Sequence, residues 1–414
     1  MTLTQRVRPI VLRILFLLGI IGPGLITASA GNDAPGIATY SMAGSFYGYG
    51  LLWVLLWAAL GAVVLLEMAA RMGAVTGKGL TELIRERFGV RVTVFIMVSL
   101  VLANLGTTTA QFAGIAASAE LFGVTRYLVV PVAAFAVWFL VLRGSYERVE
   151  KVLLSLTLYA VAYIITVFLV RPPWGEVLQR TIVPTVRLEP DYLLALLATV
   201  GTTVTPWSCA YMQASVADKG VTGVEYPYTR LDVLLGLVLS SLVAAFIVIS
   251  AAVTLFANGI RVETAKQAAL ALAPLAGPWA RQLFGIGLFG ASLLAASVLP
   301  LATTYAVCEV FGWERGINHT ADEAPIFYGL YTSLIVLSSI VVLIPGIPLF
   351  PLMWLSQVLN AILLPLVMAF MLRLANDTGI MKKWRNSRLT NVLAAVLAAV
   401  ITLATAALLA EALF

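Results

Sequence analysis

The chain has 414 residues, of which 61% are hydrophobic and 11% are charged, whereas a typical soluble domain has about 25% charged residues. Its apolar runs repeatedly exceed the roughly 20 residues that a helix needs to cross a bilayer, and they are continuous, whereas a β-barrel would show alternation. These features exclude a soluble domain and predict an all-α polytopic membrane protein. The net charge of +6 is less informative than its distribution.

Eleven apolar segments are long enough to span the membrane. They lie near residues 14–46, 50–72, 93–122, 127–142, 151–170, 191–217, 233–257, 282–311, 325–345, 350–372 and 389–412. We expect the first to be a span and not a cleaved signal, because it runs past any plausible cleavage site. With the N-terminus inside, 19 of the 26 Lys and Arg residues face the cytoplasm and 7 face outward. The positive-inside rule therefore predicts a cytoplasmic N-terminus and an extracellular C-terminus.

The first span is interrupted by "GNDAPG", residues 31–36. Pro35 removes a backbone donor and disrupts the helix, and lipid offers no partner to the carbonyls that are freed. Asp33 lies at the same break, where an ionised carboxylate costs roughly 2.5–3.5 kcal/mol. We therefore expect Asp33 to pair with a cation or to line a wet cavity.

The sixth span, with "GTTVTPWSCAYMQAS", has Pro206 at its centre. Breaks in the first and sixth spans, each the first of five, are typical of a transporter with a substrate site at mid-membrane. We expect one transmembrane transporter domain over 1–414, with repeat one about 14–170, repeat two about 191–372 and helix eleven about 389–412. The alternative is that both prolines only kink their helices, and that neighbouring helices hydrogen-bond to the freed backbone groups.

Other polar residues also fall within spans. Glu67 and Glu309 lie near cytoplasmic span ends, where we expect water to solvate them. Gln357 and Asn360 are three residues apart on one helical face, so they either hydrogen-bond between helices or line the cavity. The two cysteines indicate neither a disulfide nor a metal motif.

Long stretches of this sequence resemble the Nramp family of divalent-metal transporters. They are "GPGLITASAGNDAPGIATYSMAGSFYGYGLLWVLL", "RMGAVTGKGLTELIRERFG", "RGSYERVEKVL", "GTTVTPWSCAYMQAS" and "MWLSQVLNAILLPLV". The resemblance covers nearly the whole chain and implies the LeuT-like fold of the APC superfamily, with two inverted five-helix repeats plus an eleventh helix. It further implies that helices 1 and 6 are unwound at mid-membrane and that the carbonyls of Ala30 and Thr202 bind the metal.

The metal-binding motifs depart from the family pattern. The Asp of the family's Asp-Pro-Gly-Asn motif is kept as Asp33, but its ligand Asn aligns with Gly36. The Met and His of the Met-Pro-His motif align with Thr205 and Trp207. We expect Thr205 to contact the ion or a water in its shell, and Trp207 to line the site. Loss of the thioether disfavours soft transition metals, because oxygen ligands suit Mg, Ca and Mn. The remaining site, with one carboxylate, carbonyls and space, suits a largely hydrated Mg²⁺ ion.

The positions of the family's proton pathway have also lost their titratable groups. Its acidic pair in the third span aligns with Thr108 and Gln111, and its second histidine aligns with Gln213. Proton carriage needs a chain of titratable groups, so we expect uncoupled transport. An inside-negative potential favours entry of a divalent ion by roughly 4.6 kcal/mol per 100 mV.

The sequence is most similar to the prokaryotic Nramp-related magnesium transporter (NRMT) branch. We expect a secondary transporter of the prokaryotic plasma membrane that takes up Mg²⁺, and also Mn²⁺, by alternating access. We expect no cofactor, no nucleic acid and no obligate protein partner. The alternative is a proton-coupled Mn²⁺ or Fe²⁺ importer of the Nramp type.

Two other classes are disfavoured. An amino-acid or organic-solute carrier on the same fold would place a substrate carboxylate at the broken helices, where Asp33 would repel it. An intramembrane enzyme would need a positioned base, and the one histidine, His319, lies in a loop.

Overall fold

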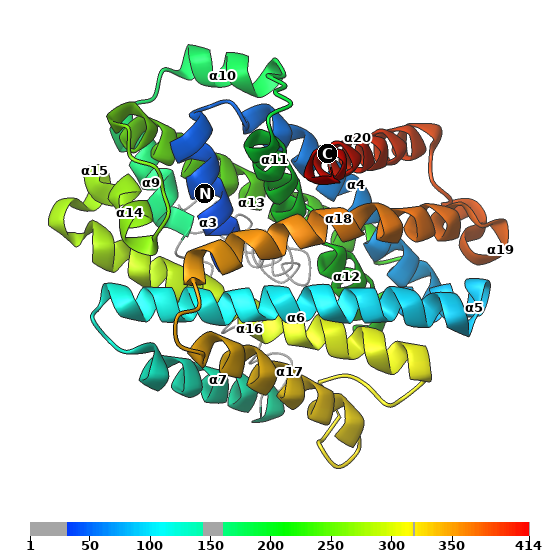
Figure 1. Ribbon diagram of the computed structural model, residues 1–414. Coiled ribbons are helices and arrows are strands. Elements are labelled where there is room, and N and C mark those ends of the chain that lie inside the picture. Colours follow the sequence, from blue (N-terminus) through cyan, green and yellow to red (C-terminus); the bar gives the residue numbers. More distant parts are fainter. Residues whose placement is uncertain (1–30, 144–159, 318, 414) are drawn as a thin grey trace, which may run out of the picture.

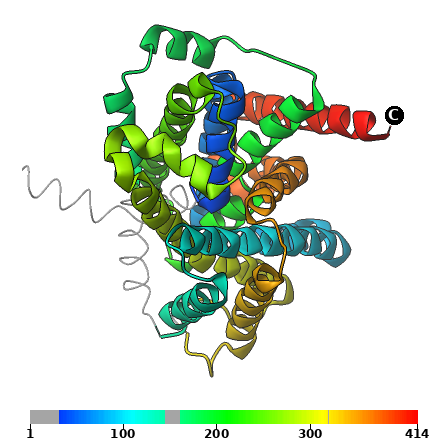
Figure 2. The ribbon, with the colours of Figure 1, turned by 60° about the vertical axis from the view of Figure 1, so that its left-hand side comes forward.

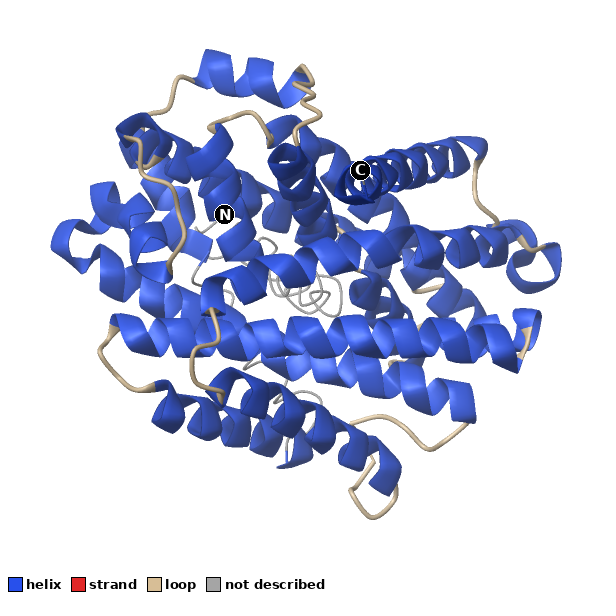
Figure 3. Ribbon diagram, viewed as in Figure 1, coloured by secondary structure: helices blue, strands red, loops and turns tan. Residues whose placement is uncertain are grey.

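The computed structural model describes residues 31–143, 160–317 and 319–413, and these residues form helices joined by loops, with no strand among them (Figure 3). The helices are α3 (Ala34–Tyr47), α4 (Leu52–Thr76), α5 (Leu80–Phe88), α6 (Val90–Leu121), α7 (Arg126–Arg143), α9 (Ala160–Val170), α10 (Trp174–Ile182), α11 (Pro190–Thr203), α12 (Pro206–Asp218), α13 (Tyr226–Thr254), α14 (Ala265–Ala269), α15 (Ala273–Ala276), α16 (Ala280–Phe311), α17 (Pro325–Leu343), α18 (Leu349–Asn376), α19 (Thr378–Met381) and α20 (Arg388–Leu413).

All eleven predicted spans coincide at least in part with described helices. Eight spans in the described part of the chain are long and apolar enough to cross a membrane, or up to nine if the bent pair α9 and α10 is one span. The eight do not include α3 and α7, which are short. The predicted spans 14–46 and 151–170 begin outside the described residues, so α3 and α9 show their C-terminal parts.

Two groups of helices pack around a long central helix. Helix α6 crosses the molecule with α16 and α18 against it, and α7 and α17 lie beyond it on one side (Figure 1). On the other side, α3 packs against α11, α13 and α18, and α4 packs against α12 and α13. Helix α20 contacts α18, α11 and α4, and its C-terminal end extends away from the other helices (Figure 2). Helix α3 is therefore in contact with α6, α11 and α13.

Close helix contacts at this centre depend on glycine. A Cβ atom on Gly201 of α11 would lie 2.0 Å from the carbonyl oxygen of Gln357 on α18. A Cβ atom on Gly114 of α6 would lie 2.2 Å from the Cβ of Ala34, the first residue of α3. Both contacts hold the two broken helices against their neighbours with little free space.

The prediction that water solvates Glu309 is wrong. Its side chain is 2% exposed and lies 3.9 Å from the guanidinium of Arg315, and the Thr81 hydroxyl donates a hydrogen bond of 2.6 Å to it. Glu67 is also paired, since Arg71 one turn along α4 donates to it at 3.2 Å. The hydroxyl of Tyr226 on α13 also donates to Glu67. Both carboxylates therefore connect neighbouring helices at this end of the molecule, and their partners replace water.

Candidate metal site

Asp33 is fixed at the start of α3. Its backbone is extended, with φ −72° and ψ −175°, and its Oδ1 accepts a hydrogen bond of 2.8 Å from the N–H of Gly36. This is the geometry of a helix N-cap, and Pro35 in the first turn suits a position that needs no donor. The positive end of the helix dipole also favours a negative charge here. The local sequence therefore aims one carboxylate at the break in the first span.

Gln111 of α6 hydrogen-bonds to the same carboxylate. Its Nε2 donates to Asp33 Oδ2, and its Oε1 accepts from the N–H of Ala34 at 3.3 Å. Gln111 is fully buried and Asp33 is 3% exposed. An amide cannot titrate, so Gln111 orients Asp33 without being able to exchange a proton with it.

The second break separates α11 from α12. Helix α11 ends at Thr203, and Thr205 adopts an extended backbone with φ −98° and ψ 138°, as expected for a residue before proline. Pro206 has no N–H for the carbonyl four residues earlier, which is that of Thr202. Pro35 stands in the same relation to the carbonyl of Gly31. The two prolines therefore each remove the helical partner of one carbonyl, at matching places in the two broken spans.

Three oxygens from these breaks converge on one point. The carbonyl of Gly31, the Oγ1 of Thr202 and the Oδ1 of Asp33 lie 2.9, 3.1 and 3.2 Å from the position that a Cβ atom on Gly36 would take. We call these three atoms the oxygen cluster. The Thr202 Oγ1 is buried and has no hydrogen-bond partner among the described residues. The three distances place these oxygens close to one another beside Gly36. The Cβ position itself is one bond length from the Gly36 Cα, so a magnesium ion, which needs oxygens at about 2.0–2.1 Å, would bind farther from that Cα and only after the oxygens move.

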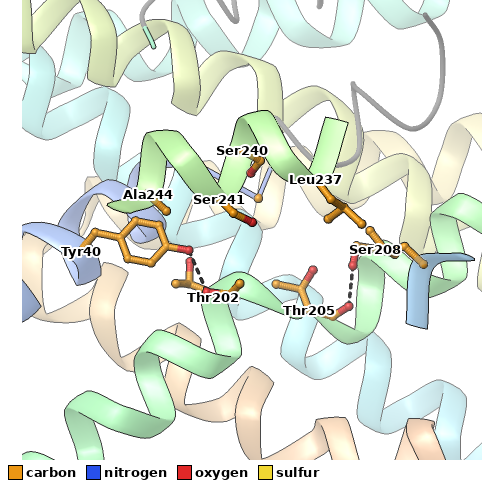
Figure 4. Close-up of a pocket in the computed structure, with 11 residues that line it drawn as sticks. Tyr40, Thr202, Thr205, Ser208, Leu237, Ser240, Ser241 and Ala244 are labelled. Carbon is orange, nitrogen blue, oxygen red and sulfur yellow. Dashed lines mark hydrogen bonds between the residues drawn. The ribbon is translucent and has the colours of Figure 1, made fainter. Parts of the chain in front are cut away.

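A small cavity adjoins the oxygen cluster (Figure 4). Besides Gly31 and Thr202, its lining consists mainly of hydroxyl side chains, namely Tyr40, Thr203, Thr205, Ser208, Ser240 and Ser241. Its volume is about 20 Å³, which is room for about one water molecule. An ion that keeps most of its water, as the sequence predicts, therefore needs α3, α13 or the α11–α12 break to move from this conformation.

The other residues predicted to line the site have separate positions. Trp207 is fully buried and its Nε1 has no partner among the described residues. On α18, Asn360 donates to Gln357 and to Thr107 of α6, both at 3.2 Å. These three predicted residues do not line the cavity beside the oxygen cluster, and their role at the site stays a prediction.

The positions of the lost proton pathway are buried. The Thr108 hydroxyl has no partner in the described part of the chain, and Gln213 donates 3.0 Å to the carbonyl of Lys78. Within residues 31–143, 160–317 and 319–413, no three or more His, Cys, Asp or Glu side chains gather into a metal-binding group. Ala30, the predicted carbonyl ligand, lies outside the described residues.

Sequence reasoning missed some of the residues that surround this site. Gly31 contributes a carbonyl to the oxygen cluster, and Pro35 four residues later is the signal that indicates it. Tyr40 lies two helical turns into α3, and its hydroxyl shares a hydrogen bond of 2.9 Å with Thr203. Ser240 and Ser241 belong to α13, and no sequence pattern marks them, because the packing of α13 against α3 brings them to the cavity.

Comparison with known proteins assigns the family. The model of the family described as natural resistance-associated macrophage protein-like (Nramp) matches residues 24–411. The chain belongs to the Nramp family. A divalent metal cation transporter MntH from Erwinia tasmaniensis is 32% identical over 380 residues, which cover 89% of each chain. The MntH protein of Bacillus subtilis is 30% identical over 293 residues, which cover 68% of each chain.

Solved structures confirm the fold of this Nramp chain. The manganese transporter of Eremococcus coleocola superposes with a TM-score of 0.75 at 21% identity, over 94% of this chain and 85% of that one. MhsT, solved with L-phenylalanine, superposes with a TM-score of 0.62 at 15% identity, over 94% of this chain and 98% of that one. The expected LeuT-like fold is therefore confirmed, and so is the expected family.

Proposed function

We propose that this chain is a divalent metal cation transporter of the prokaryotic plasma membrane. The observation that carries the proposal is the oxygen cluster, in which one carboxylate meets a carbonyl and a hydroxyl from two paired helix breaks. Membership of the Nramp family and relatives named as divalent metal cation transporters support it. The distribution of Lys and Arg supports a cytoplasmic N-terminus and an extracellular C-terminus.

Mg²⁺ is the proposed cargo, as in the NRMT branch. The three atoms of the cluster are all oxygens, and hard oxygen ligands suit Mg²⁺, Ca²⁺ and Mn²⁺ better than soft metals. Thr205 adds a hydroxyl to the cavity, where a thioether would favour softer ions. Because Gly36 has no side chain, no Cβ atom presses against the three oxygens.

A proton-coupled Mn²⁺ importer is the second candidate, and the names of known proteins favour it. The relatives are called MntH, and the solved structure with the TM-score of 0.75 is that of a manganese transporter. Manganese also accepts carboxylate and carbonyl oxygens, so the cluster itself is compatible with both ions. The two candidates differ in selectivity against Mg²⁺ and in proton movement.

The side chains around Asp33 support uncoupled transport. Its direct partner from α6 is the amide of Gln111, and Thr108 on the same helix is a hydroxyl, so neither position supplies a titratable group for a relay. The membrane potential alone supplies roughly 4.6 kcal/mol per 100 mV for a divalent ion.

Ion flux into liposomes that contain the purified protein tests both candidates. External Mg²⁺, Mn²⁺ or Ca²⁺ is added under an inside-negative potential, with a divalent-ion dye and a pH dye inside. We expect Mg²⁺ entry, competition by Mn²⁺, and no acidification that follows the ion. Mn²⁺ entry with acidification and without Mg²⁺ entry would establish the second candidate. No divalent entry with active protein in the membrane would refute both.

A further inference from the structure

Asn32, the residue directly before Asp33, joins the first helix break to α13. Its side chain is 3% exposed, and its Nδ2 donates a hydrogen bond of 2.8 Å to the carbonyl of Ser240. Ser240 lies within the continuous helix α13, and a carbonyl oxygen has two lone pairs, so it can accept this bond besides one from its own helix. The bond therefore connects two elements without interrupting α13.

The bond connects two parts of the wall of the cavity beside the oxygen cluster. Gly31, which precedes Asn32, lines this cavity, and so do Ser240 and Ser241 of α13. Helix α13 runs along one side of the cavity, opposite the α11–α12 break (Figure 4). Since the volume of about 20 Å³ is room for about one water molecule, the separation of α13 from the breaks limits how much water an ion can bring.

A second contact between α3 and α13 lies farther along both helices. A Cβ atom on Gly44 of α3 would lie 2.4 Å from the carbonyl oxygen of Val248 on α13, so the two backbones are closely packed there. Val248 lies about 12 Å along α13 from Ser240, at 1.5 Å per residue, and Ser241 of the cavity lies between them. Helix α13 can therefore move away from the first break by a tilt about the Gly44 contact, and the Asn32 bond opposes this tilt.

Ions that keep their water need more room than this conformation gives. Mg²⁺ dehydrates reluctantly and usually keeps several waters, whereas the larger Mn²⁺ ion holds its waters less tightly and accepts protein oxygens in their place. An ion that needs the wider cavity binds only to the fraction of molecules in which the Asn32 bond is broken. Its apparent affinity is reduced by that fraction.

We propose that Asn32 is a positioning residue that discriminates between divalent ions by the amount of water they keep. While the bond to Ser240 is intact, the empty cavity stays narrow, and binding of a largely hydrated ion requires the bond to break. An ion that sheds more of its water needs less of this opening. This inference rests on the proposed function, and it applies whichever of Mg²⁺ and Mn²⁺ is the main cargo.

Divalent uptake into proteoliposomes by Asn32→Leu tests this role. Leucine has the same branching as asparagine but cannot donate a hydrogen bond. The apparent affinity for Mg²⁺ is expected to rise about 2- to 12-fold, which is the net 0.5–1.5 kcal/mol of a hydrogen bond converted at 1.4 kcal/mol per factor of ten. The affinity for Mn²⁺ is expected to rise less, so the ratio of Mg²⁺ to Mn²⁺ affinity increases.

Asn32→Ala is a second variant, which removes the same donor without added methyl groups. It is expected to shift the ratio of Mg²⁺ to Mn²⁺ affinity in the same direction. Thermal unfolding in detergent shows which of the two variants is folded. A ratio that is unchanged, or that moves toward Mn²⁺, in a folded variant would overturn the proposal.

Asn104→Leu is the matched control. Asn104 of α6 is 1% exposed, and its Nδ2 donates a hydrogen bond, also of 2.8 Å, to Thr303 of α16. Asn104 is not among the residues that line the cavity. The control is expected to lose stability but to keep the wild-type ratio of affinities. An equal change of the ratio in Asn32→Leu and Asn104→Leu would show a general effect of losing a buried hydrogen bond, and it would overturn the proposal.

Cysteine labelling of the ion-free protein tests the opening of the cavity without transport. Ser208 of α12 lines the cavity and is 6% exposed, so a Ser208→Cys thiol is expected to react slowly with a polar thiol reagent. The protein without this substitution gives the background, and its Cys209 and Cys308 are buried. Addition of Asn32→Leu is expected to raise the labelling rate about 2- to 12-fold, in proportion to the open fraction, and addition of Asn104→Leu to leave it unchanged.

The two measurements separate this inference from the proposed function. An unchanged labelling rate on addition of Asn32→Leu would refute the role of Asn32, even if the wild type carries divalent ions. Absence of divalent uptake by the wild type would refute the proposed function, and with it the selection between ions.

Discussion

Gly36→Ala is expected to block the oxygen cluster. The added Cβ would lie 2.9 Å from the carbonyl oxygen of Gly31, 3.1 Å from Thr202 Oγ1 and 3.2 Å from Asp33 Oδ1. The carbonyl belongs to the backbone and yields less easily than a side chain, so the methyl group takes the space between the ligands. Overpacking of this kind costs about 1–3 kcal/mol. If that cost falls on the ion-bound state, the affinity for the ion falls about 5- to 150-fold, since 1.4 kcal/mol is a factor of ten.

The assay is initial divalent uptake into proteoliposomes as a function of ion concentration. Gly329→Ala is the matched control, because Gly329 is a helical residue of α17 with nothing within 4 Å of its added Cβ. Thermal unfolding of both variants in detergent shows whether the Gly36 variant is folded. A folded Gly36→Ala variant with wild-type apparent affinity would refute the assignment of the ion to this cluster.

Four other substitutions test separate parts of the site. Asp33→Asn removes the charge at nearly constant shape, and uptake is expected to fall below detection in a folded protein, whereas wild-type rates would contradict the ligand role. Thr205→Met adds a thioether to the cavity, so the ratio of Mn²⁺ to Mg²⁺ affinity is expected to rise; an unchanged ratio would place selectivity elsewhere. Gln111→Glu puts two carboxyl groups in contact, and like charges disfavour ionisation of both. A proton then competes with the ion, so uptake by this variant is expected to be lower at pH 6 than at pH 8. Uptake by the wild type is expected to change little over the same range. Gly201→Ala forces α11 away from Gln357, so the free energy of unfolding is expected to fall by about 1–3 kcal/mol. Thermal unfolding is compared with that of Gly329→Ala, and equal melting temperatures would contradict the close contact.

The fold could be predicted from the sequence because lipid imposes strong constraints. Apolar runs of sufficient length must be helices, and each predicted span overlaps a described helix. The start of α3 could also be predicted, since Asp33 and Pro35 are a cap and a first-turn proline. The environment of Glu309 could not, because its partner Thr81 lies 228 residues earlier in the chain.

The motif positions of Asp33, Gly36 and Thr202 predict site residues, and the structure places these three residues next to one another. The sequence predicts the Thr202 carbonyl as the ligand, whereas the cluster contains its hydroxyl, and binding of an ion by these residues stays a prediction. The contact between Gln111 and Asp33 joins α6 to α3 across 78 residues, and helix packing creates it. The hydroxyl lining from α13 arises in the same way, so local sequence carries no signal for it. The cavity volume depends on the conformation, and composition does not determine it.

Anomalous diffraction from crystals of this protein that contain Mn²⁺ tests the central claim most directly. Manganese marks the ion position, and excess Mg²⁺ in a second crystal tests whether the two ions share it. We expect one peak between Asp33 Oδ1, the Gly31 carbonyl and Thr202 Oγ1, within about 2.0–2.6 Å of an oxygen of the cluster, which disappears in excess Mg²⁺. A peak elsewhere in the membrane region, with none at the cluster in a protein that carries the ion into liposomes, would contradict the proposed site.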